Sequence, residues 1–434
     1  MRQKLLRQGA DELSYEIRGI VRKAEQLQSI GQSIFWENIG DPIQKNRKLT
    51  DWMKQIITNL LMEDETYGYS HSKGLLSTRQ FLADRNNQIG GAQLDVEDIT
   101  FFNGLGDAIG KVYQYLLPTA RIIGPSPAYS THSSAEAAHA NDQPITYRLD
   151  PEDQWFPDLD DLYLKVKYNQ AIVAILVINP DNPTGMVYPR PILERIVEIA
   201  KEFNLFLIFD EIYMNIVYNN AKTCLMSEVI DEVPGISLKG ISKEIPWPGA
   251  RCGWAEYYNR DKDPDFNKLC HTIDNAKMIE VSATTLPQRA IPLIMSDPRY
   301  PSFLKETNDR IGSRSRFMTN YLEDIPYIKF NLTNGAFYNT IIFKENVLKK
   351  GQFMEIENPA VKKLLASWLA EKDMPLDQRF VYYLLAAKGV CVVPISAFCS
   401  DLLGFRITLL EENESERETI FSRIKDGLLE YCGD

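Results

Sequence analysis

Three polar stretches follow strand-like runs of the sequence, at Asn179-Pro180-Asp181-Asn182-Pro183-Thr184-Gly185, Asp210-Glu211-Ile212-Tyr213 and Ile241-Ser242-Lys243. The apolar runs before them, 171–178, 206–209 and 235–238, have the length and composition of buried strands. A helical pattern over 191–203 separates the first two runs. Strand–helix alternation of this kind predicts a mainly parallel sheet covered on both faces. Because such sheets place ligands at the carboxyl ends of their strands, we expect the three polar stretches to form one site.

The rest of the chain predicts two domains. Further strands are expected at 98–102, 121–124 and 252–257. After about residue 300 the pattern loosens, with helices expected at 302–321 and 359–370 and strands at 337–343 and 390–393. A chain of 434 residues is long enough for two cores. We expect a large α/β domain at 51–300 and a smaller α+β domain made of 1–50 and 301–434, which includes an N-terminal helix over 11–27.

Composition and charge exclude several classes of function. A net charge of −11 repels phosphate backbones and disfavours nucleic-acid binding. The six cysteines form no C-x-x-C pair, which fits a reducing compartment, and the four histidines lack ligand spacing, so no metal site is expected. No signal-peptide pattern opens the chain, and its longest apolar run is far below the ~20 residues of a membrane span. We therefore expect a cytoplasmic protein without a membrane partner.

The three stretches also resemble a known family. N-P-x-N-P-T-G, D-E-x-Y and S-K-x(4)-P-G-x-R-x-G-W, in this order, resemble the class I and II aminotransferases of fold type I, which use pyridoxal 5′-phosphate (PLP). The stretches 15–19 and 38–42 resemble the bacterial alanine (glutamate–pyruvate) members most. The resemblance implies a three-layer α/β/α domain with a mainly parallel sheet, a smaller α+β domain, a homodimer, and an amino acid and a 2-oxo acid as substrates.

The resemblance assigns the cofactor's reactive end to four residues. Lys243 is expected to carry PLP through its amine and then to move the substrate α-proton. Its alternative, a surface lysine, is disfavoured by the spacing to Arg251. Asp210 is expected to pair with the pyridine nitrogen, with a helix N-cap as the alternative. Tyr213 and Asn182 are expected to donate to the phenolate oxygen, and Asn182 also suits a turn.

The phosphate of the cofactor needs a cation and backbone N–H groups. The resemblance implies a cup made by Asn103-Gly104-Leu105-Gly106 at a helix start, together with Ser242 and Arg251, and completed by Tyr69 of a second subunit. A dinucleotide fingerprint is rejected for this loop, because the third glycine comes one residue late and no acidic residue follows at the required distance. Tyr129 is expected to stack on the cofactor ring, although ordinary core packing would explain it equally well from residues alone.

The resemblance also assigns residues to the binding of the substrate. Arg406 resembles the arginine that binds the α-carboxylate, and its alternative is a solvated arginine. Asn182, Gly40, Tyr15 and Arg18 are implied nearby, with Arg18 as the candidate cation for a second carboxylate and a solvated helix position as its alternative. The dicarboxylate-reading arginine of aspartate aminotransferases has no counterpart, so we expect a small neutral, alanine-like substrate.

Two other functions compete with transamination. A PLP-dependent lyase or decarboxylase would use the same cofactor residues, so the motifs do not separate it from a transaminase. A non-enzymatic binding module is disfavoured by the intact set of Lys243, Asp210 and Arg406. The region 345–380 is longer than in the family and has no functional interpretation.

Overall fold

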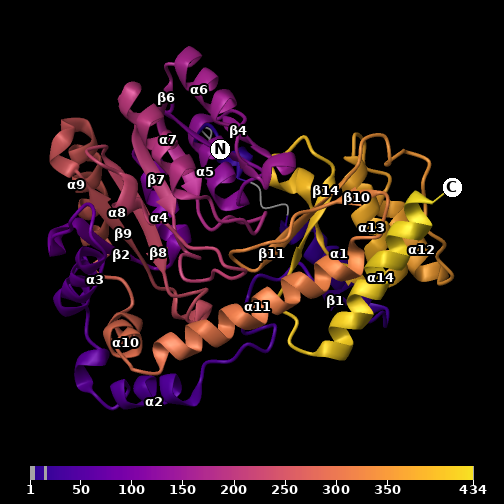
Figure 1. Ribbon diagram of the computed structural model, residues 1–434, viewed down its shortest axis with the longest axis horizontal. Coiled ribbons are helices and arrows are strands. Elements are labelled where there is room, and N and C mark those ends of the chain that lie inside the picture. The colour runs from indigo at the N-terminus through magenta and orange to yellow at the C-terminus, as the bar shows by residue number, and fades with distance from the viewer. Residues whose placement is uncertain (1–4, 14–16, 434) are drawn as a thin grey trace.

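The computed structural model describes residues 5–13 and 17–433. Two bodies lie side by side, and the long helix α11 (Tyr300–Leu322) runs from one to the other (Figure 1). Tyr300 belongs to the hydrophobic core of the larger body, while Met318 and Leu322 belong to the core of the smaller one. The proposed boundary near residue 300 therefore falls at the start of a continuous helix that both cores share.

The larger body is built on a mixed, mainly parallel sheet. Within the described residues this sheet has eight strands in the order β2-β9-β8-β7-β6-β3-β4-β5. The inner pairs from β8 to β4 are parallel, and the pairs at the two edges are antiparallel. The strands are β2 (Ile99–Phe102), β3 (Arg121–Ser126), β4 (Thr146–Asp150), β5 (Phe156–Pro157), β6 (Ile172–Ile178), β7 (Phe206–Asp210), β8 (Gly235–Gly240) and β9 (Gly253–Tyr258).

Alternate residues of these strands face two different helix layers. Leu207 and Phe209 of β7 lie in one core cluster, and Ile208 between them lies in the other, as the period of two in a strand requires. Helices on the first face are α2 (Asp51–Leu60), α3 (Leu76–Ile89), α6 (Leu159–Tyr168), α7 (Arg190–Glu202), α8 (Met226–Val229) and α10 (Thr285–Met295). On the second face lie α4 (Leu105–Gln114), α5 (Ser130–Ala140) and α9 (Pro264–Ile279). The predicted three-layer α/β/α architecture is confirmed.

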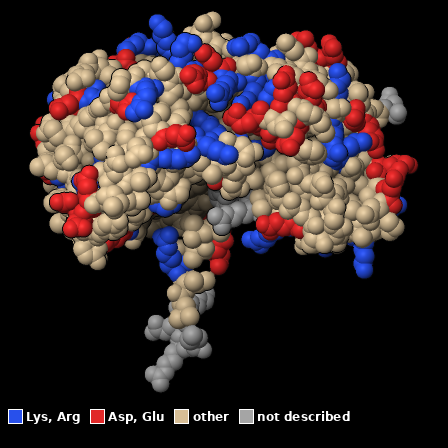
Figure 2. Space-filling view, turned by 90° about the horizontal axis from the view of Figure 1, so that it is seen from below, with Lys and Arg blue, Asp and Glu red and all other residues tan. Residues whose placement is uncertain are grey.

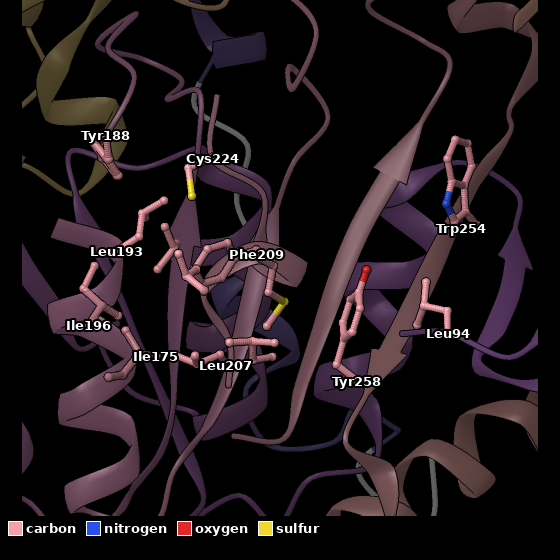
Figure 3. Close-up of a cluster of buried hydrophobic side chains, with 14 of the residues drawn as sticks. Leu94, Ile175, Tyr188, Leu193, Ile196, Leu207, Phe209, Cys224, Trp254 and Tyr258 are labelled. Carbon is pink, nitrogen blue, oxygen red and sulfur yellow. The ribbon is translucent and has the colours of Figure 1, made fainter. Parts of the chain in front are cut away.

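Side chains of α7 show how the helices hold the sheet. Leu193 and Ile196 point from α7 toward Ile175 of β6 and Leu207 of β7 (Figure 3). All four are fully buried. Each such side chain contributes about 1.5–3 kcal/mol by leaving water, which fixes the helix against the strands that end at the polar stretches.

The smaller body has its own sheet and helices. In the described ranges its sheet has the order β10-β11-β14-β13, all antiparallel, with β10 (Ile328–Lys329), β11 (Tyr338–Phe343), β13 (Val393–Pro394) and β14 (Gly404–Thr408). A parallel pair joins β1 (Phe35–Trp36) to β12 (Val390–Cys391). Around them pack α1 (Ile17–Ser29), α12 (Pro359–Trp368), α13 (Leu376–Lys388) and α14 (Glu414–Cys432).

Two expectations differ from the structure in detail. The N-terminal α-helix begins at Ile17, and Ala10–Glu12 forms a separate 3-10 turn preceded by Gly9 with φ of 78°. The apolar run 390–393 forms two short strands instead of one, because Val390 and Cys391 pair with β1 whereas Val393 and Pro394 pair with β14.

No helix in the described ranges is long and apolar enough to cross a membrane. Seen from below, charged side chains of both signs are spread over both bodies (Figure 2).

Candidate active site

A cavity of about 440 Å³ lies where the polar stretches meet. It sits at the carboxyl ends of β6 and β7, beside the segment that follows β8, and β11 and β14 of the smaller body close it. The structure thus brings together residues from all three stretches, as the strand order requires. Its lining includes Val21, Asn38, Ile39, Gly40, Asp41, Gln44, Leu105, Gly106, Ile109, Tyr129, Ile178, Asn182, Asp210, Ile212, Tyr213, Ser242, Lys243, Pro248, Arg251, Tyr338 and Arg406.

The amine of Lys243 points into this cavity. Its Nζ donates a hydrogen bond to the Gly40 carbonyl oxygen at 2.8 Å. The same nitrogen lies 5.9 Å from the ring centre of Tyr213 and 5.7 Å from that of Phe337. Ser242 and Lys243 are both half-buried. A surface lysine is therefore ruled out, and the amine stands on the cavity wall between aromatic faces.

The carboxylate of Asp210 ends β7 in a dry environment. The residue is 2% exposed. Oδ2 lies 3.0 Å from Nε2 of His132, and Oδ1 accepts the Ile212 backbone N–H at 3.2 Å. Among the described residues, His132 Nδ1 has no hydrogen-bond partner. A buried carboxylate held by an imidazole is a fixed anionic group that can pair with a cationic ring nitrogen in the cavity.

The phenol of Tyr213 lies three residues after Asp210. Its hydroxyl is 3.1 Å from the hydroxyl of Tyr338 on β11. Burial, and secondarily the neighbouring Tyr338 phenol, raises the pKa of Tyr213 well above its ordinary value. Tyr213 therefore stays protonated at neutral pH and can donate a hydrogen bond into the cavity.

The guanidinium of Arg251 lies against the start of α4. Gly104 has φ of 88°, and a Cβ there would lie 2.3 Å from Nη2 of Arg251. Only glycine at this position lets the guanidinium approach the helix start. Leu105 and Gly106 line the cavity at the first turn of α4, where free N–H groups stabilise an anion. Asn103 is exposed, and its Oδ1 accepts the Thr284 N–H at 3.2 Å.

A second guanidinium, that of Arg406 on β14, also lines the cavity. Arg406 is 3% exposed. Nη1 donates to Oδ1 of Asn182 at 3.3 Å, and Nη2 donates to the Asn38 carbonyl oxygen at 2.7 Å. Its guanidinium carbon lies 4.5 Å from the ring centre of Tyr338 and 5.1 Å from that of Phe398. Arg406 is thus a buried cation at the cavity wall, not a solvated arginine.

The segment 37–47 links the two bodies beside the cavity. At one end, the Glu37 carbonyl accepts the Thr408 N–H at 2.9 Å. Lys45, a buried lysine, pairs with Glu411 at 3.3 Å and also with Glu37. At the other end, Nη2 of Arg47 donates to the Glu244 carbonyl at 3.0 Å, next to Lys243. Desolvation lowers the pKa of Arg47 to about 10, so the group remains a cation at neutral pH.

The remaining expected residues are placed as follows. Tyr129 caps α5 and meets His132 edge-on, with ring centres 6.4 Å apart. Tyr69 is 85% exposed and is absent from the cavity wall. Tyr15 lies outside the described residues. Arg18 belongs to α1, but its side chain is outside the described part of the chain.

The residues of this site that sequence reasoning did not find include His132, Asn38 and Tyr338. His132 could have been found, because it lies three residues after Tyr129 and therefore on the same side of a helix. Asn38 contacts Arg406 through its carbonyl oxygen, and no side-chain pattern reveals a backbone contact. Tyr338 lies in an ordinary apolar strand, and only the pairing of β11 with β14 brings it to the cavity.

Comparison with known proteins shows to which family the chain belongs. Residues 37–423 match the family described as Aminotransferase class I and II. The chain belongs to this family and is a transaminase; members of the family use PLP. An uncharacterized aminotransferase of Methanocaldococcus jannaschii is 52% identical over 431 residues, 99% of each chain.

More distant relatives have named activities. The glutamate–pyruvate aminotransferase AlaA of Escherichia coli is 32% identical over 331 residues, which cover 76% of this chain and 80% of that protein. The solved alanine aminotransferase of Pyrococcus furiosus superposes with a TM-score of 0.84 at 25% identity and covers 98% of this chain and 99% of its own. The fold is therefore that of the fold type I aminotransferases.

Proposed function

We propose that this transaminase uses PLP to move an amino group between a small neutral L-amino acid, such as alanine, and a 2-oxo acid. One observation carries the proposal, namely a single cavity whose wall holds an amine, a buried carboxylate and a buried guanidinium, at Lys243, Asp210 and Arg406. These are the groups that an aldehyde cofactor and an α-carboxylate substrate require.

The residues of the cavity fit PLP group by group. The amine of Lys243 suits the aldehyde, and the buried carboxylate of Asp210 suits the pyridine nitrogen. Gly104 leaves room for Arg251 beside the α4 start, a cradle that a Cβ would fill. The remaining contacts are proposed for Tyr213 and Asn182 at the phenolate oxygen, Tyr129 at the ring, and Asn103, Leu105, Gly106 and Ser242 around the phosphate.

The chemistry divides between cofactor and protein. When bound, PLP supplies an electron sink for the charge that develops at the substrate α-carbon. Lys243 Nζ would remove the proton from that carbon and would deliver it to the carbon of the former cofactor aldehyde. Asp210 holds a proton at the pyridine nitrogen, and Arg406 orients the substrate by two N–H groups on its carboxylate.

The charges on the wall favour a neutral side chain. Among described residues, the lining cations are Lys243, Arg251 and Arg406, and each has a role at the cofactor or the α-carboxylate. Asp41 also lines the cavity, and its carboxylate disfavours a second negative charge. The named activities of the E. coli and P. furiosus relatives support an alanine-like substrate. For glutamate we propose Arg18 as the additional cation, with Tyr15 as a further residue of the same pocket.

We also propose a cytoplasmic homodimer in which Tyr69 completes the neighbouring cavity. Tyr69 and Ile279 are 85% and 86% exposed, and Met278 and Val281 are exposed as well. The loop that holds Tyr69 is bonded to the start of α10, since Thr285 Oγ1 donates to the Gly68 carbonyl at 2.8 Å. An apolar surface of this kind is typical of a protein interface.

The test is a panel of amino acids with pyruvate and 2-oxoglutarate as acceptors, run on the PLP-loaded enzyme. We expect alanine to be a donor to 2-oxoglutarate. Lys243→Ala serves as the control and should lose turnover by at least about 100-fold. Turnover with aromatic or basic amino acids alone would contradict the alanine assignment, and release of products without a 2-oxo acid would contradict transamination itself.

A further inference from the structure

Tyr338 contacts three parts of the site at once and has no role in the proposals above. Its hydroxyl lies 3.1 Å from that of Tyr213, and its ring lies 4.5 Å below the guanidinium carbon of Arg406. A Cβ on Gly40 would come within 2.1 Å of its hydroxyl oxygen. The residue is 2% exposed and lines the cavity.

The register of the small sheet explains this position. On the antiparallel pair β11–β14, Arg406 is opposite Thr340, and Tyr338 is two residues away on the same face. Diagonal neighbours on one face are within reach of aromatic and long side chains. Tyr338 is therefore held by the same two strands that hold Arg406.

We propose that Tyr338 is a positioning residue with two separable roles: its hydroxyl orients Tyr213 toward the cofactor, and its ring supports the guanidinium of Arg406 for the substrate carboxylate. This inference rests on the proposed function, because it assigns Tyr213 to the cofactor and Arg406 to the substrate. It adds a residue from the small sheet that serves both.

The hydroxyl role follows from the burial of Tyr213. A buried phenol needs a partner for its hydroxyl, and Tyr213 has Tyr338 as a partner. When Tyr213 donates its proton into the cavity, its oxygen is left to accept the proton of Tyr338. Two hydroxyls in series polarise each other, so the donor facing the cofactor becomes stronger and has a fixed direction.

The ring role follows from the charge of Arg406. Within residues 5–13 and 17–433, no carboxylate lies within 4.0 Å of this buried guanidinium. Its Nε also lacks a hydrogen-bond partner in that part of the chain. The faces of Tyr338 and Phe398 are the aromatic surfaces that stabilise the cation before substrate arrives, and such contacts strengthen when water is excluded.

Two variants separate the roles in the full-length protein. Tyr338→Phe removes the hydroxyl and keeps the ring, whereas Tyr338→Leu removes both. Tyr218→Phe is the matched control, because Tyr218 is a buried phenol of the same core whose hydroxyl bonds to Thr333 and Gly335, away from the cavity. The PLP dissociation constant and the pH titration of the visible cofactor band report on the hydroxyl. Binding of propionate, an α-carboxylate mimic without an amine, to the loaded enzyme reports on Arg406.

We expect Tyr338→Phe to weaken PLP binding about fivefold and to displace the pH titration of the band, with propionate binding unchanged. Tyr338→Leu should show the same cofactor effects and also weaken propionate binding about tenfold. Tyr218→Phe should match the wild type in both. A Tyr338→Phe enzyme with wild-type PLP affinity and band titration overturns the hydroxyl role, and equal propionate affinity in the Phe and Leu variants overturns the ring role. A wild type that forms no visible band with PLP contradicts the proposed function instead.

Discussion

His132 and Asp210 form a buried pair, with Nε2 of the imidazole 3.0 Å from Oδ2 of the carboxylate. The two residues come from α5 and from the end of β7, which are far apart in the sequence. Besides the Ile212 N–H, the imidazole holds the carboxylate, so the direction of Asp210 at the cavity wall is fixed. This second contact distinguishes Asp210 from an aspartate that only caps a turn.

We predict that Asp210→Ala lowers kcat by at least about 100-fold, because a fixed charge at the cofactor ring is lost. The chain should still fold, since Asp210 ends its strand and the ladder bonds of β7 are made by backbone groups. Exchange of the substrate α-proton with solvent, followed by NMR, isolates the affected step. Exchange at the wild-type rate in a folded Asp210→Ala protein would rule out this role.

Gly40→Ala tests the fit of the segment 37–47 against Tyr338. A Cβ at this position would lie 2.1 Å from the Tyr338 hydroxyl, so either the segment or the ring must move. Because the Gly40 carbonyl also receives the Lys243 amine, we expect kcat to fall about 100-fold, as for a displacement of about 1 Å in an active site. Gly351→Ala, where the added carbon meets no atom within 4 Å, is the control. Equal kcat for both variants would contradict the proposed crowding.

The sequence predicted that polar residues at strand ends would meet in one cavity, and the structure places them there. The positions of Lys243, Asp210 and Asn182 follow from apolar runs that end in polar stretches, and the parallel order of the strands brings them together. Tyr338 could not be predicted in this way, since its role depends on a register between two strands about 65 residues apart. Arg251 was expected at the phosphate, but only the structure shows that Gly104 makes room for it.

Tyr69→Ala tests the proposed dimer. Its side chain is exposed in a single chain, so its removal should not affect folding. If the ring reaches the neighbouring phosphate, we expect the PLP dissociation constant to rise about fivefold, the effect of one lost hydrogen bond. Tyr168→Ala, with 77% exposure on the far helix α6, is the control. A fully active monomer by sedimentation at nanomolar concentration would exclude the shared site.

Arg18→Ala tests whether this arginine binds the second carboxylate of glutamate in the cavity that also binds alanine. We expect the variant to keep alanine as a donor and to lose glutamate by about tenfold or more in kcat/KM, because only glutamate carries a second carboxylate. Arg195→Ala, an exposed arginine on α7 that is absent from the cavity lining, is the control. Equal loss of both donors, or no loss of either, would remove Arg18 from the substrate site.

The buried carboxyl group of Asp181 should make the stability of the fold depend on pH. Burial raises the pKa of this carboxyl from 3.8 to about 7, against the hydrogen bonds from Thr184 that lower it. Between about pH 4 and pH 7 the folded chain therefore holds a proton that the unfolded chain has lost, and the free energy of unfolding falls as pH rises through this window, by up to about 4 kcal/mol from this group.

The isosteric Asp181→Asn variant has no charge to titrate. Its free energy of unfolding should therefore rise relative to that of the wild type between pH 5 and pH 8. Urea unfolding of the PLP-free protein at both values measures the difference, with Asp160→Asn, an exposed carboxyl, as the control. Parallel curves for Asp181→Asn and the wild type would show that Asp181 titrates at its ordinary value.

The segment 37–47 has a mechanical consequence. Glu37 and Lys45 fix it to β14 and to Glu411, while Arg47 fixes it to the backbone beside Lys243. Within this short span the segment also gives one carbonyl to Arg406 and another to the Lys243 amine. Of these five attachments three are to the smaller body and two to the larger, so a rotation of one body against the other must strain or release one of these two sets. We therefore expect any opening of the cleft to strain either the contact between Gly40 and the Lys243 amine or the contact between Asn38 and Arg406.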